Sequence, residues 1–518
     1  MTEYGHDIAP VGALDEAALL STIGPAVTPA LHALQGYGAV VHEGSHRAVN
    51  HPMRVAAGLH DFANGLIDPR VYSVAVLHDL AQRVHDRDYG RNALRALNAY
   101  ATDDGVSKNE WEYVSAHLGD LDVVEEYSES IRHAEHGGNV QLKEILRSKS
   151  SSEVSIPIWM WNADSDLTSP AQMLELLDRV NLASVLTKGA EMLDNLMYPS
   201  RKDGAILQDI FDAESFYAPL SEITGFDGLA MALRGKAARI RLERSGNIGV
   251  LHEAQTQLDA LGSREFVARA IGGMFTELVG GDSIVEHAVE NKAQHQVTIG
   301  ESLLQHPSLG ATETMRAVWR LKTLGSLAMK LARGKSAYDL VGITLMAEDT
   351  DQLASVYRML ADKVAAGMEN GTVNASGEIK PFDVRGDSTF LEKVLGTAGS
   401  ECALPGAVAV MEKPTGDYEV AKMTFLYKVI DGGVTRHFPV EIQLQTEEAR
   451  TRSRIGTASH IAYKAARGGP EGERPAFEVE LLAKIRERKS QLRAPQLAEE
   501  SVVRGAALRR LVSKSKSH

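Results

Sequence analysis

Apolar residues in the first half of the chain recur at the spacing of an α-helix. From residue 16 to residue 197 apolar side chains return every three to four positions, and β-branched alternation is rare. Examples are Val55, Leu59, Phe62 and Leu66. The same spacing continues over residues 215–242 and 250–278, so we expect an all-α region followed by a helical connector.

The pattern changes after residue 335, where short apolar runs rich in β-branched residues begin. Residues 340–346 (LVGITLM) predict a strand, and residues 353–364 return to helical spacing. Further strand candidates are residues 407–411, 421–430 and 437–444, the last two joined by the turn signal Asp431-Gly432-Gly433. We therefore expect an α+β domain with a mixed sheet flanked by helices. The polar, glycine-rich residues 367–386 are expected to form a mobile loop.

The length of the chain requires more than one domain. Single hydrophobic cores stop growing near about 250–300 residues, and this chain has 518 residues. We expect an N-terminal segment (1–30), an all-α domain (31–200), a helical connector (201–310), an α+β domain (311–466) and a basic helical tail (467–518).

The composition is ordinary for a soluble globular protein, with 44% apolar and 24% charged residues. Charges interrupt the apolar stretches well before the ~20 residues that a membrane span needs. Residues 1–10 do not have the pattern of a secretory signal. The single cysteine, Cys402, fits a reducing compartment. These features predict a cytoplasmic protein without membrane contact.

The charge limits the ligands that the chain can bind. A formal net charge of −14 argues against a protein that grips nucleic acid with its whole surface, because phosphate binding depends on Lys and Arg. An anionic ligand must therefore meet a local cluster of cations. Basic residues outnumber acidic ones between residues 484 and 516. That tail is interpreted either as a solvated helix or as a contact for RNA or a protein partner.

Two histidines and an aspartate in the all-α domain have the chemistry of a metal site. His51 starts one expected helix, and His78-Asp79 closes the apolar run of another. Adjacent residues on a helix point about 100° apart, so His78 and Asp79 reach one ion only if it lies between helices, with His51 approaching from the second. The alternative is a set of helix-surface histidines, which we favour for His60, His85, His133 and His136.

These residues resemble the HD hydrolase domain of the RelA/SpoT family, which makes and degrades the guanosine alarmone (p)ppGpp. The family motifs HPxxVA, LLHD and KLADRLHN are similar to residues 51–56 (HPMRVA), 76–79 (VLHD) and 188–195 (KGAEMLDN). The resemblance implies Mn²⁺ ligands at His51, His78, Asp79 and Glu191, and a nucleotide contact at Asn195. It also implies (p)ppGpp 3′-pyrophosphohydrolase activity.

The chain departs from the hydrolase pattern close to these motifs. Gln82 and Arg83 stand where the family has an acidic pair that positions the attacking water, and neither side chain can serve as a base. Residues 42–45 (HEGS) replace the basic loop that precedes the first motif. The sequence therefore leaves hydrolase activity open.

The second half of the chain offers cations for a triphosphate. Pyrophosphate transfer needs Mg²⁺ held by carboxylates, cations along the phosphates, and a base for the attacking hydroxyl. Arg320, Lys322 and Lys330 lie in a stretch that we expect to be helical. Lys322 and Lys330 would lie within about 80° of each other around that helix, so they would share a broad face.

Two carboxylates accompany these cations. Asp339 lies at the entrance of the strand predicted at residues 340–346. Glu441 lies between Val440 and Ile442, so in a strand it faces the opposite side of the sheet from them, in phase with Gln443. A charged residue within such a strand indicates either an open sheet face or a role in metal binding and catalysis.

Residues 316–464 resemble the RelA/SpoT synthetase domain. Residues 440–448 (VEIQLQTEE) are similar to VEVQIRTEE, and residues 456–464 (GTASHIAYK) to GIAAHWKYK. The resemblance implies Mg²⁺ ligands at Asp339 and Glu441, with Glu441 also activating the 3′-hydroxyl of GDP or GTP. It implies nucleotide contacts at Arg320, Lys322, Lys330, Tyr418, Lys422, Gln443 and His460, the first three to ATP.

Some synthetase motifs differ from the family. Residues 413–418 (KPTGDY) are similar to the start of PKxNGYQSLH, whose tyrosine stacks on guanine, but Lys422 stands where the family has histidine. Val341 and Thr344 replace the arginines of YDLRAVR. Template-type nucleotidyltransferases carry an Asp-x-Asp pair on the first strand. Asp349 and Asp351 have this spacing but follow the strand, where we expect a helix cap.

The preferred hypothesis is an ATP-dependent GTP/GDP 3′-pyrophosphokinase, a (p)ppGpp synthetase with an HD domain. Two alternatives come from the altered motifs. One is a metal-dependent phosphohydrolase whose synthetase-like half is not catalytic. The other is a silent regulator that binds guanine nucleotides.

Overall fold

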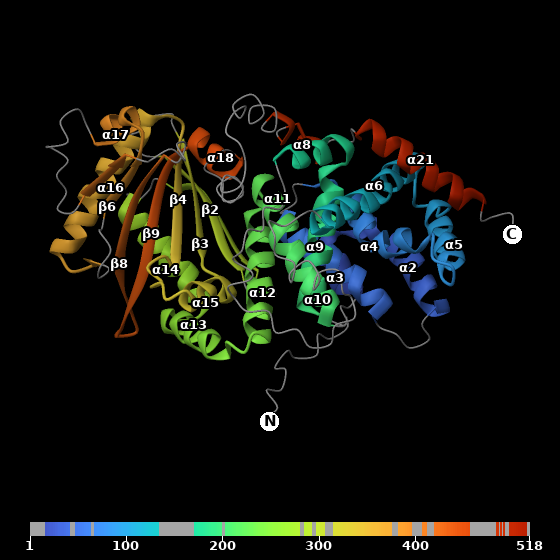
Figure 1. The fold of residues 1–518 in the computed structure, drawn as a ribbon, viewed down its shortest axis with the longest axis horizontal. Coiled ribbons are helices and arrows are strands. Elements are labelled where there is room, and N and C mark those ends of the chain that lie inside the picture. The colour runs from blue at the N-terminus through green and yellow to red at the C-terminus, as the bar shows by residue number, and fades with distance from the viewer. Residues whose placement is uncertain are drawn as a thin grey trace. The chain divides into compact units, whose positions relative to one another are not determined.

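The computed structural model consists of two compact units (Figure 1). It describes residues 16–41, 47–63, 67–133, 170–198, 203–279, 284–292, 297–305, 314–375, 382–395, 407–411, 419–455 and, between 483 and 514, all but 486, 489 and 493–496. The helical unit contains the described residues up to 233 together with those from 483 onward. The sheet unit contains the described residues from 234 to 455.

The helical unit is formed by helices from both ends of the chain. Its described elements are α1 (Glu16–Ile23), η1 (Pro25–Val27), α2 (Thr28–Val41), α3 (Arg47–Ala63), α4 (Arg70–Arg83), α5 (Gly90–Ala101), α6 (Lys108–His133), α8 (Pro170–Arg179), α9 (Leu182–Met197), α10 (Asp203–Asp212), η3 (Ala213–Tyr217), α11 (Ala218–Ile223) and α21 (Glu499–Lys514). α12 (Asp227–Arg244) begins in this unit and ends in the sheet unit. The chain therefore returns to the helical unit after the sheet is complete.

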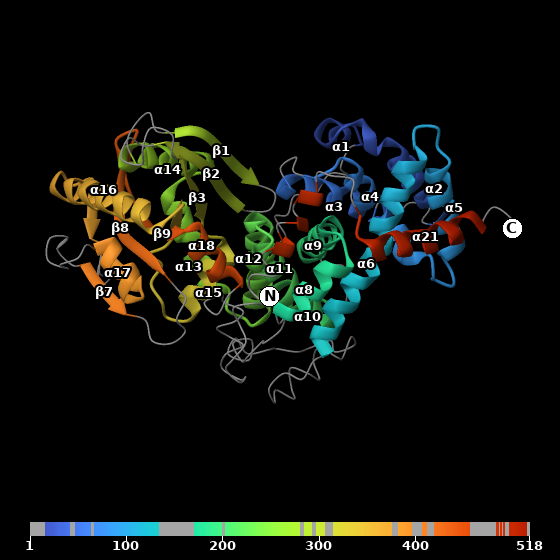
Figure 2. The ribbon, with the colours of Figure 1, turned by 90° about the horizontal axis from the view of Figure 1, so that it is seen from above.

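α4 is the central helix of the helical unit. It packs against α3, α5 and α6, and it also contacts α9 (Figure 2). Its buried residues lie on every side of the helix, as expected for a helix surrounded by others. α3 buries Val55, Leu59 and Phe62, the apolar face that the sequence predicted. These helices carry two of the histidines that were predicted to bind a metal, His51 on α3 and His78 on α4.

The sheet unit combines a nine-stranded mixed sheet with six further helices in its described part. The strands are β1 (Ile284–Lys292), β2 (Val297–Gln305), β3 (Thr314–Leu321), β4 (Val341–Ala347), β5 (Val373–Ala375), β6 (Phe382–Gly386), β7 (Ala407–Met411), β8 (Val420–Asp431) and β9 (Val434–Thr446). The helices are α13 (Ile248–Leu261), α14 (Arg264–Val279), α15 (Leu324–Ala332), α16 (Thr350–Glu369), α17 (Ser388–Leu395) and α18 (Glu447–Ile455). The helical region followed by an α+β region confirms the coarse fold prediction.

The strand order is β1-β2-β3-β4-β9-β8-β6-β7, with β5 paired to β8. β4 and β9 run parallel, as do β6 and β7, and the other pairs are antiparallel. One row of in-register core residues consists of Trp319, Ile343, Ile442 and Met423. Residues of α13, α14, α15, α16 and α17 join the same apolar core. Because side chains alternate along a strand, the positions between these core residues face the other side of the sheet.

Two local signals were predicted correctly. β8 and β9 are joined by Gly432 and Gly433, with φ of 54° and 83°. Positive φ at both central positions is what a type I′ hairpin turn requires. Asp349 is the N-cap of α16, and its side chain accepts a hydrogen bond from the backbone nitrogen of Gln352 at 2.8 Å.

Three predictions about secondary structure were wrong. The connector expected over residues 201–310 is not helical throughout, because β1 and β2 lie in it. Residues 367–386 contain β5 and β6 as well as the end of α16, so a loop does not span them. Arg320 lies on β3 and not on a helix. In each case the segment forms a strand by pairing with a neighbouring strand of the sheet. This pairing outweighs the secondary structure that the local sequence pattern favours.

Candidate functional site

The predicted metal ligands of the helical unit converge. His51 on α3 and His78 and Asp79 on α4 each offer a ligand atom, and these atoms lie within 4.8 Å of one another. His51 Nε2 lies 3.3 Å from His78 Nε2, and His78 Nε2 lies 3.5 Å from Asp79 Oδ1. The helix boundaries differ from the prediction, because α3 begins at Arg47 and α4 continues to Arg83. The side chains nevertheless meet between the two helices, as the predicted metal site requires.

The other ring nitrogen of each histidine is fixed by an oxygen. His78 Nδ1 lies 2.6 Å from the backbone oxygen of Ala75, and His51 Nδ1 lies 2.6 Å from Asp194 Oδ2. Burial lowers the pKa of His51, but the bond to Asp194 and the charges of Asp79 and Glu191 outweigh it, so the pKa is raised overall. Metal-binding histidines usually donate their second N–H to an oxygen in this way, which orients the ring.

Asp194 is itself held by an arginine that the sequence analysis did not single out. Arg54 donates from Nε to Asp194 Oδ1 at 2.7 Å and from Nη2 to Oδ2 at 2.8 Å. Burial raises the pKa of Asp194, but the bonds from His51 and Arg54 lower it overall. In the sequence, only the three-residue spacing of His51 and Arg54 on one helix indicated that they could bind a common partner. That partner, Asp194, lies 140 residues or more away along the chain.

Glu191, the fourth predicted ligand, lies beside the histidines but is paired with a lysine. Its Oε2 is 3.9 Å from His78 Nε2 and 2.8 Å from Lys188 Nζ. Burial alone would raise the pKa of Glu191, but Lys188, His78 and His51 lower it to about 2. The carboxylate is therefore ionised, as a metal ligand must be. Asn195, half-buried, lies on the same helix.

A further carboxylate comes from α6. Lys188 Nζ lies 3.2 Å from Glu125 Oε2, and Gln82 Nε2 donates to the same oxygen at 3.0 Å. Arg83 lies over the ring of Tyr89, 5.5 Å from its centroid. Gln82 is thus not an acid itself, but it binds the carboxylate of Glu125, whose side chain is about half exposed. Two imidazole nitrogens with one or two carboxylates form a donor set that could hold a divalent transition-metal ion.

The predicted cations of the sheet unit meet one of the predicted carboxylates. Lys322 Nζ lies 2.7 Å from Asp339 Oδ2, and Lys330 Nζ lies 2.6 Å from Asp339 Oδ1. Lys322 follows β3, Lys330 lies on α15, and Asp339 precedes β4, so the lysines do not share a helix face as predicted. Burial raises the pKa of Asp339, but the two lysines lower it overall.

The sheet register brings Arg320 and Glu441 to the same face. Arg320 on β3 pairs with Gly342 on β4, which pairs with Glu441 on β9. Residues in register project from the same side of a sheet, so the two charged side chains flank the bare glycine. A Cβ at Gly342 would lie 3.5 Å from Arg320 Nε, in ordinary contact. Glu441 Oε1 accepts a hydrogen bond from Gln443 Nε2.

Lys422 and Gln443 lie on the same polar face, one row further along the sheet, where they pair in register. Asp339 lies three residues before Gly342, at the end of the sheet where β4 begins. A magnesium ion shared by Asp339 and Glu441 stays a prediction. Tyr418 and His460, the other predicted nucleotide contacts, lie outside the described residues.

Comparisons with known proteins do not assign the chain to a family. No protein-family model matches it, and no curated protein matches it. Among the described residues, no helix combines the length and the apolar character needed to cross a membrane. The two candidate sites are therefore interpreted from their own residues and contacts.

Proposed function

We propose that the sheet unit transfers a pyrophosphate group from ATP to the 3′-hydroxyl of GDP or GTP, as the resemblance to RelA/SpoT synthetases implies. The observation that carries the proposal is the pairing of Arg320, Gly342 and Glu441 across three strands. Because Gly342 has no side chain, this pairing leaves an open space between the carboxylate of Glu441 and the guanidinium of Arg320 on one polar face of the sheet. Lys322 and Lys330, gathered on Asp339, supply cations at the adjacent end of β4.

Each residue has a role in this reaction. Glu441 accepts the proton of the 3′-hydroxyl, whose oxygen forms a bond to the β-phosphorus of ATP. The bond from that phosphorus to the oxygen bridging the α- and β-phosphates breaks, and AMP leaves. Lys322 and Lys330 exchange Asp339 for phosphate oxygens, while Arg320 binds ATP. Mg²⁺, for which Asp339 and Glu441 are suitable oxygen donors, would neutralise phosphate charge when bound.

A nucleotide assay tests this proposal. Purified protein with ATP, Mg²⁺ and GDP or GTP should yield AMP and the 3′-pyrophosphorylated guanosine nucleotide. Glu441→Gln should lower the rate by about 10²–10⁴-fold, the usual contribution of a general base. Glu448→Gln, an exposed position on α18, is the matched control and should retain the rate. Absence of product from the wild-type protein with both acceptors would overturn the proposal.

A second activity is supported by the convergence of His51, His78 and Asp79 in the helical unit. We propose that they bind a divalent ion such as Mn²⁺ and that this unit hydrolyses a nucleotide phosphate ester, the (p)ppGpp 3′-pyrophosphate in particular. Metal analysis of the purified protein should find about one ion per chain, and His78→Ala should lose it. Retention of the ion by that variant would exclude this site.

A further inference from the structure

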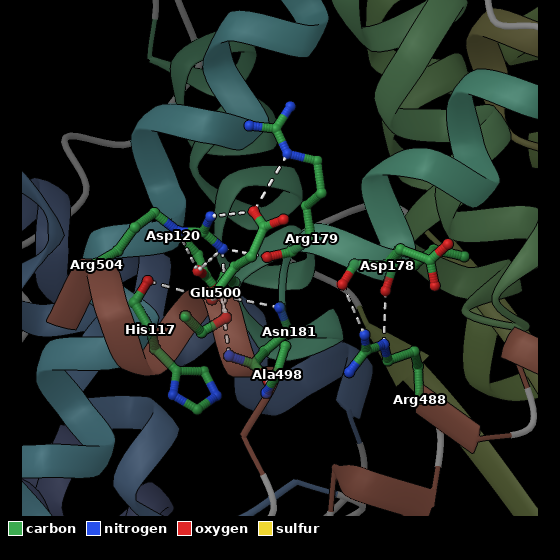
Figure 3. Close-up of polar contacts among 12 residues, drawn as sticks. His117, Asp120, Asp178, Arg179, Asn181, Arg488, Ala498, Glu500 and Arg504 are labelled. Carbon is green, nitrogen blue, oxygen red and sulfur yellow. Dashed lines mark hydrogen bonds and ion pairs between the residues drawn. The ribbon is translucent and has the colours of Figure 1, made fainter.

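Asp120 on α6 is a fully buried carboxylate whose partners come from distant parts of the chain (Figure 3). Its Oδ2 accepts hydrogen bonds from the backbone nitrogen of Asn181 at 2.8 Å and from Asn181 Nδ2 at 2.9 Å. Ser501 Oγ donates to Oδ2 at 2.8 Å, and Arg504 donates to Oδ1 from Nε at 3.0 Å and from Nη2 at 2.6 Å. A buried charge is tolerated only when it is paired and hydrogen-bonded. α21 therefore supplies hydrogen bonds to both carboxylate oxygens of Asp120.

The first turn of α9 is held by the same group of contacts. Asn181 is the N-cap residue of α9, but its side chain does not cap the helix. Instead, it bridges Asp120 and the C-terminal segment, where the backbone nitrogen of Ala498 donates to Asn181 Oδ1 at 3.1 Å. Ser184, in the first turn, donates to the backbone oxygen of His117 at 3.2 Å. The N-terminal end of α9 is thus fixed to α6 and to the segment that leads into α21.

The C-terminal segment also closes the end of α8. Arg488, which is buried, donates from Nε to the backbone oxygen of Leu177 at 2.6 Å and from Nη2 to that of Asp178 at 3.0 Å. These carbonyls lie in the last turn of α8, where a cation is favourable. Gly505 lets α21 approach α6 closely, because a Cβ there would lie 2.7 Å from the Cα of Ala116. Basic residues of the tail are therefore used within the helical unit.

α9 and α6, which Asp120 and Asn181 join, also carry residues at or beside the candidate metal centre. α9 carries Glu191 and Asp194, and Asp194 orients His51. Asn181 and Asp194 are about 20 Å apart along a helix that rises 1.5 Å per residue. α6 is tied to α9 a second time, through Glu125 and Lys188. One continuous helix thus joins the contacts of the C-terminal segment, at its start, to the residues that contact the histidines, in its second half.

We propose that Ala498, Ser501 and Arg504, together the C-terminal clasp, hold α9 in the position that the metal centre requires. Asp120 and Arg504 are then positioning residues, which act on His51 through α9. The part of this inference that concerns metal binding rests on the proposed metal centre. The part that concerns structure, namely that the clasp fixes α9, does not depend on it.

The test compares Arg504→Ala with Arg510→Ala, an exposed arginine on the same helix. Each protein, with all 518 residues, is titrated with Co²⁺, whose visible absorption reports the ligand geometry, and the exchange of backbone amides in α9 is measured in parallel. Arg504→Ala should bind Co²⁺ at least about tenfold more weakly, as expected when support of the ligands is lost. Its spectrum should change, and its α9 amides should exchange faster. Arg510→Ala should match the wild type. Ser501→Ala, which removes one bond to Asp120, should shift in the same direction if Arg504→Ala does not fold.

The outcomes separate the two halves of the inference. Wild-type affinity, spectrum and α9 exchange in Arg504→Ala would overturn it. Faster exchange in α9 with an unchanged spectrum and affinity would overturn the positioning role. If the wild-type protein binds no Co²⁺ or Mn²⁺, the metal centre itself fails, and the exchange data alone decide whether the clasp fixes α9.

Discussion

Asp194 offers a direct test of the proposed metal centre, because it makes two separable contributions. Its carboxylate accepts the N–H of His51, which would leave Nε2 to bind the ion, and it balances the charge of Arg54. Asp194→Asn keeps an acceptor for one partner but removes the charge. Asp194→Ala removes both the acceptor and the charge. The two variants therefore separate orientation of the histidine from charge.

The expected magnitudes follow from the burial of the three side chains, which are 14%, 16% and 7% exposed for His51, Arg54 and Asp194. Removing one partner of a mostly buried ion pair costs about 3 kcal/mol of the free energy of unfolding. Asp194→Ala should therefore destabilise the helical unit by roughly that amount, and Asp194→Asn by less, because the amide oxygen remains as one acceptor. Loss of a group that orients a ligand lowers metal affinity by about 10–100-fold, or about 1.4–2.7 kcal/mol.

Calorimetric titration with Mn²⁺ measures the affinity, and chemical denaturation measures the stability. Asp88→Asn, an exposed aspartate after α4, is the control for a lost carboxylate and should change neither quantity. The affinities should fall in the order wild type, Asp194→Asn, Asp194→Ala. A folded Asp194→Ala protein that binds Mn²⁺ as tightly as the wild type would refute this account of His51.

Three further predictions concern the sheet unit. Gly342→Ala should not lower stability, because a Cβ there makes only ordinary contact with Arg320. It should lower nucleotide turnover, and normal turnover would show that the space beside Glu441 is not used. Lys330→Ala should raise the KM for ATP more than it lowers kcat, as steady-state kinetics will show, since one cation for the phosphates is lost; an unchanged KM would contradict that role. Gly433→Val should cost about 1–3 kcal/mol of stability in denaturant titration, because its φ of 83° is unfavourable for an L residue, whereas Thr435→Val, just beyond the turn, should cost little.

The sequence predicted those elements whose pattern is local. The apolar face of α3, the strand at β4 and the glycine turn between β8 and β9 each depend on neighbouring residues, and all three agree with the structure. The end of β3 at Arg320 was mistaken for part of a helix, although Met315, Ala317 and Trp319 before it alternate with exposed or half-exposed residues as a strand requires. β1 and β2 were missed because their stability comes from pairing with each other and with β3.

In the candidate sites, too, the sequence predicted what depends on local spacing and missed what depends on long-range contacts. Motif spacing identified His51, His78 and Asp79, and the helices bring their ligand atoms together. The contacts that support them join segments far apart in the chain, such as Arg54 with Asp194. The partnership of Asp120 with Arg504 spans 384 residues and leaves no local pattern. Long-range partners of this kind depend on the packing of whole helices, which spacing along the sequence does not specify.

The most direct test of pyrophosphate transfer follows the β- and γ-phosphates of ATP. ATP labelled at its γ-phosphorus is incubated with the protein, Mg²⁺ and GDP, and the products are separated by chromatography. Transfer of the intact group predicts label in a guanosine nucleotide with two added phosphates, together with unlabelled AMP in equal amount. Label found only in inorganic phosphate or pyrophosphate, with GDP unchanged, would contradict the proposed reaction.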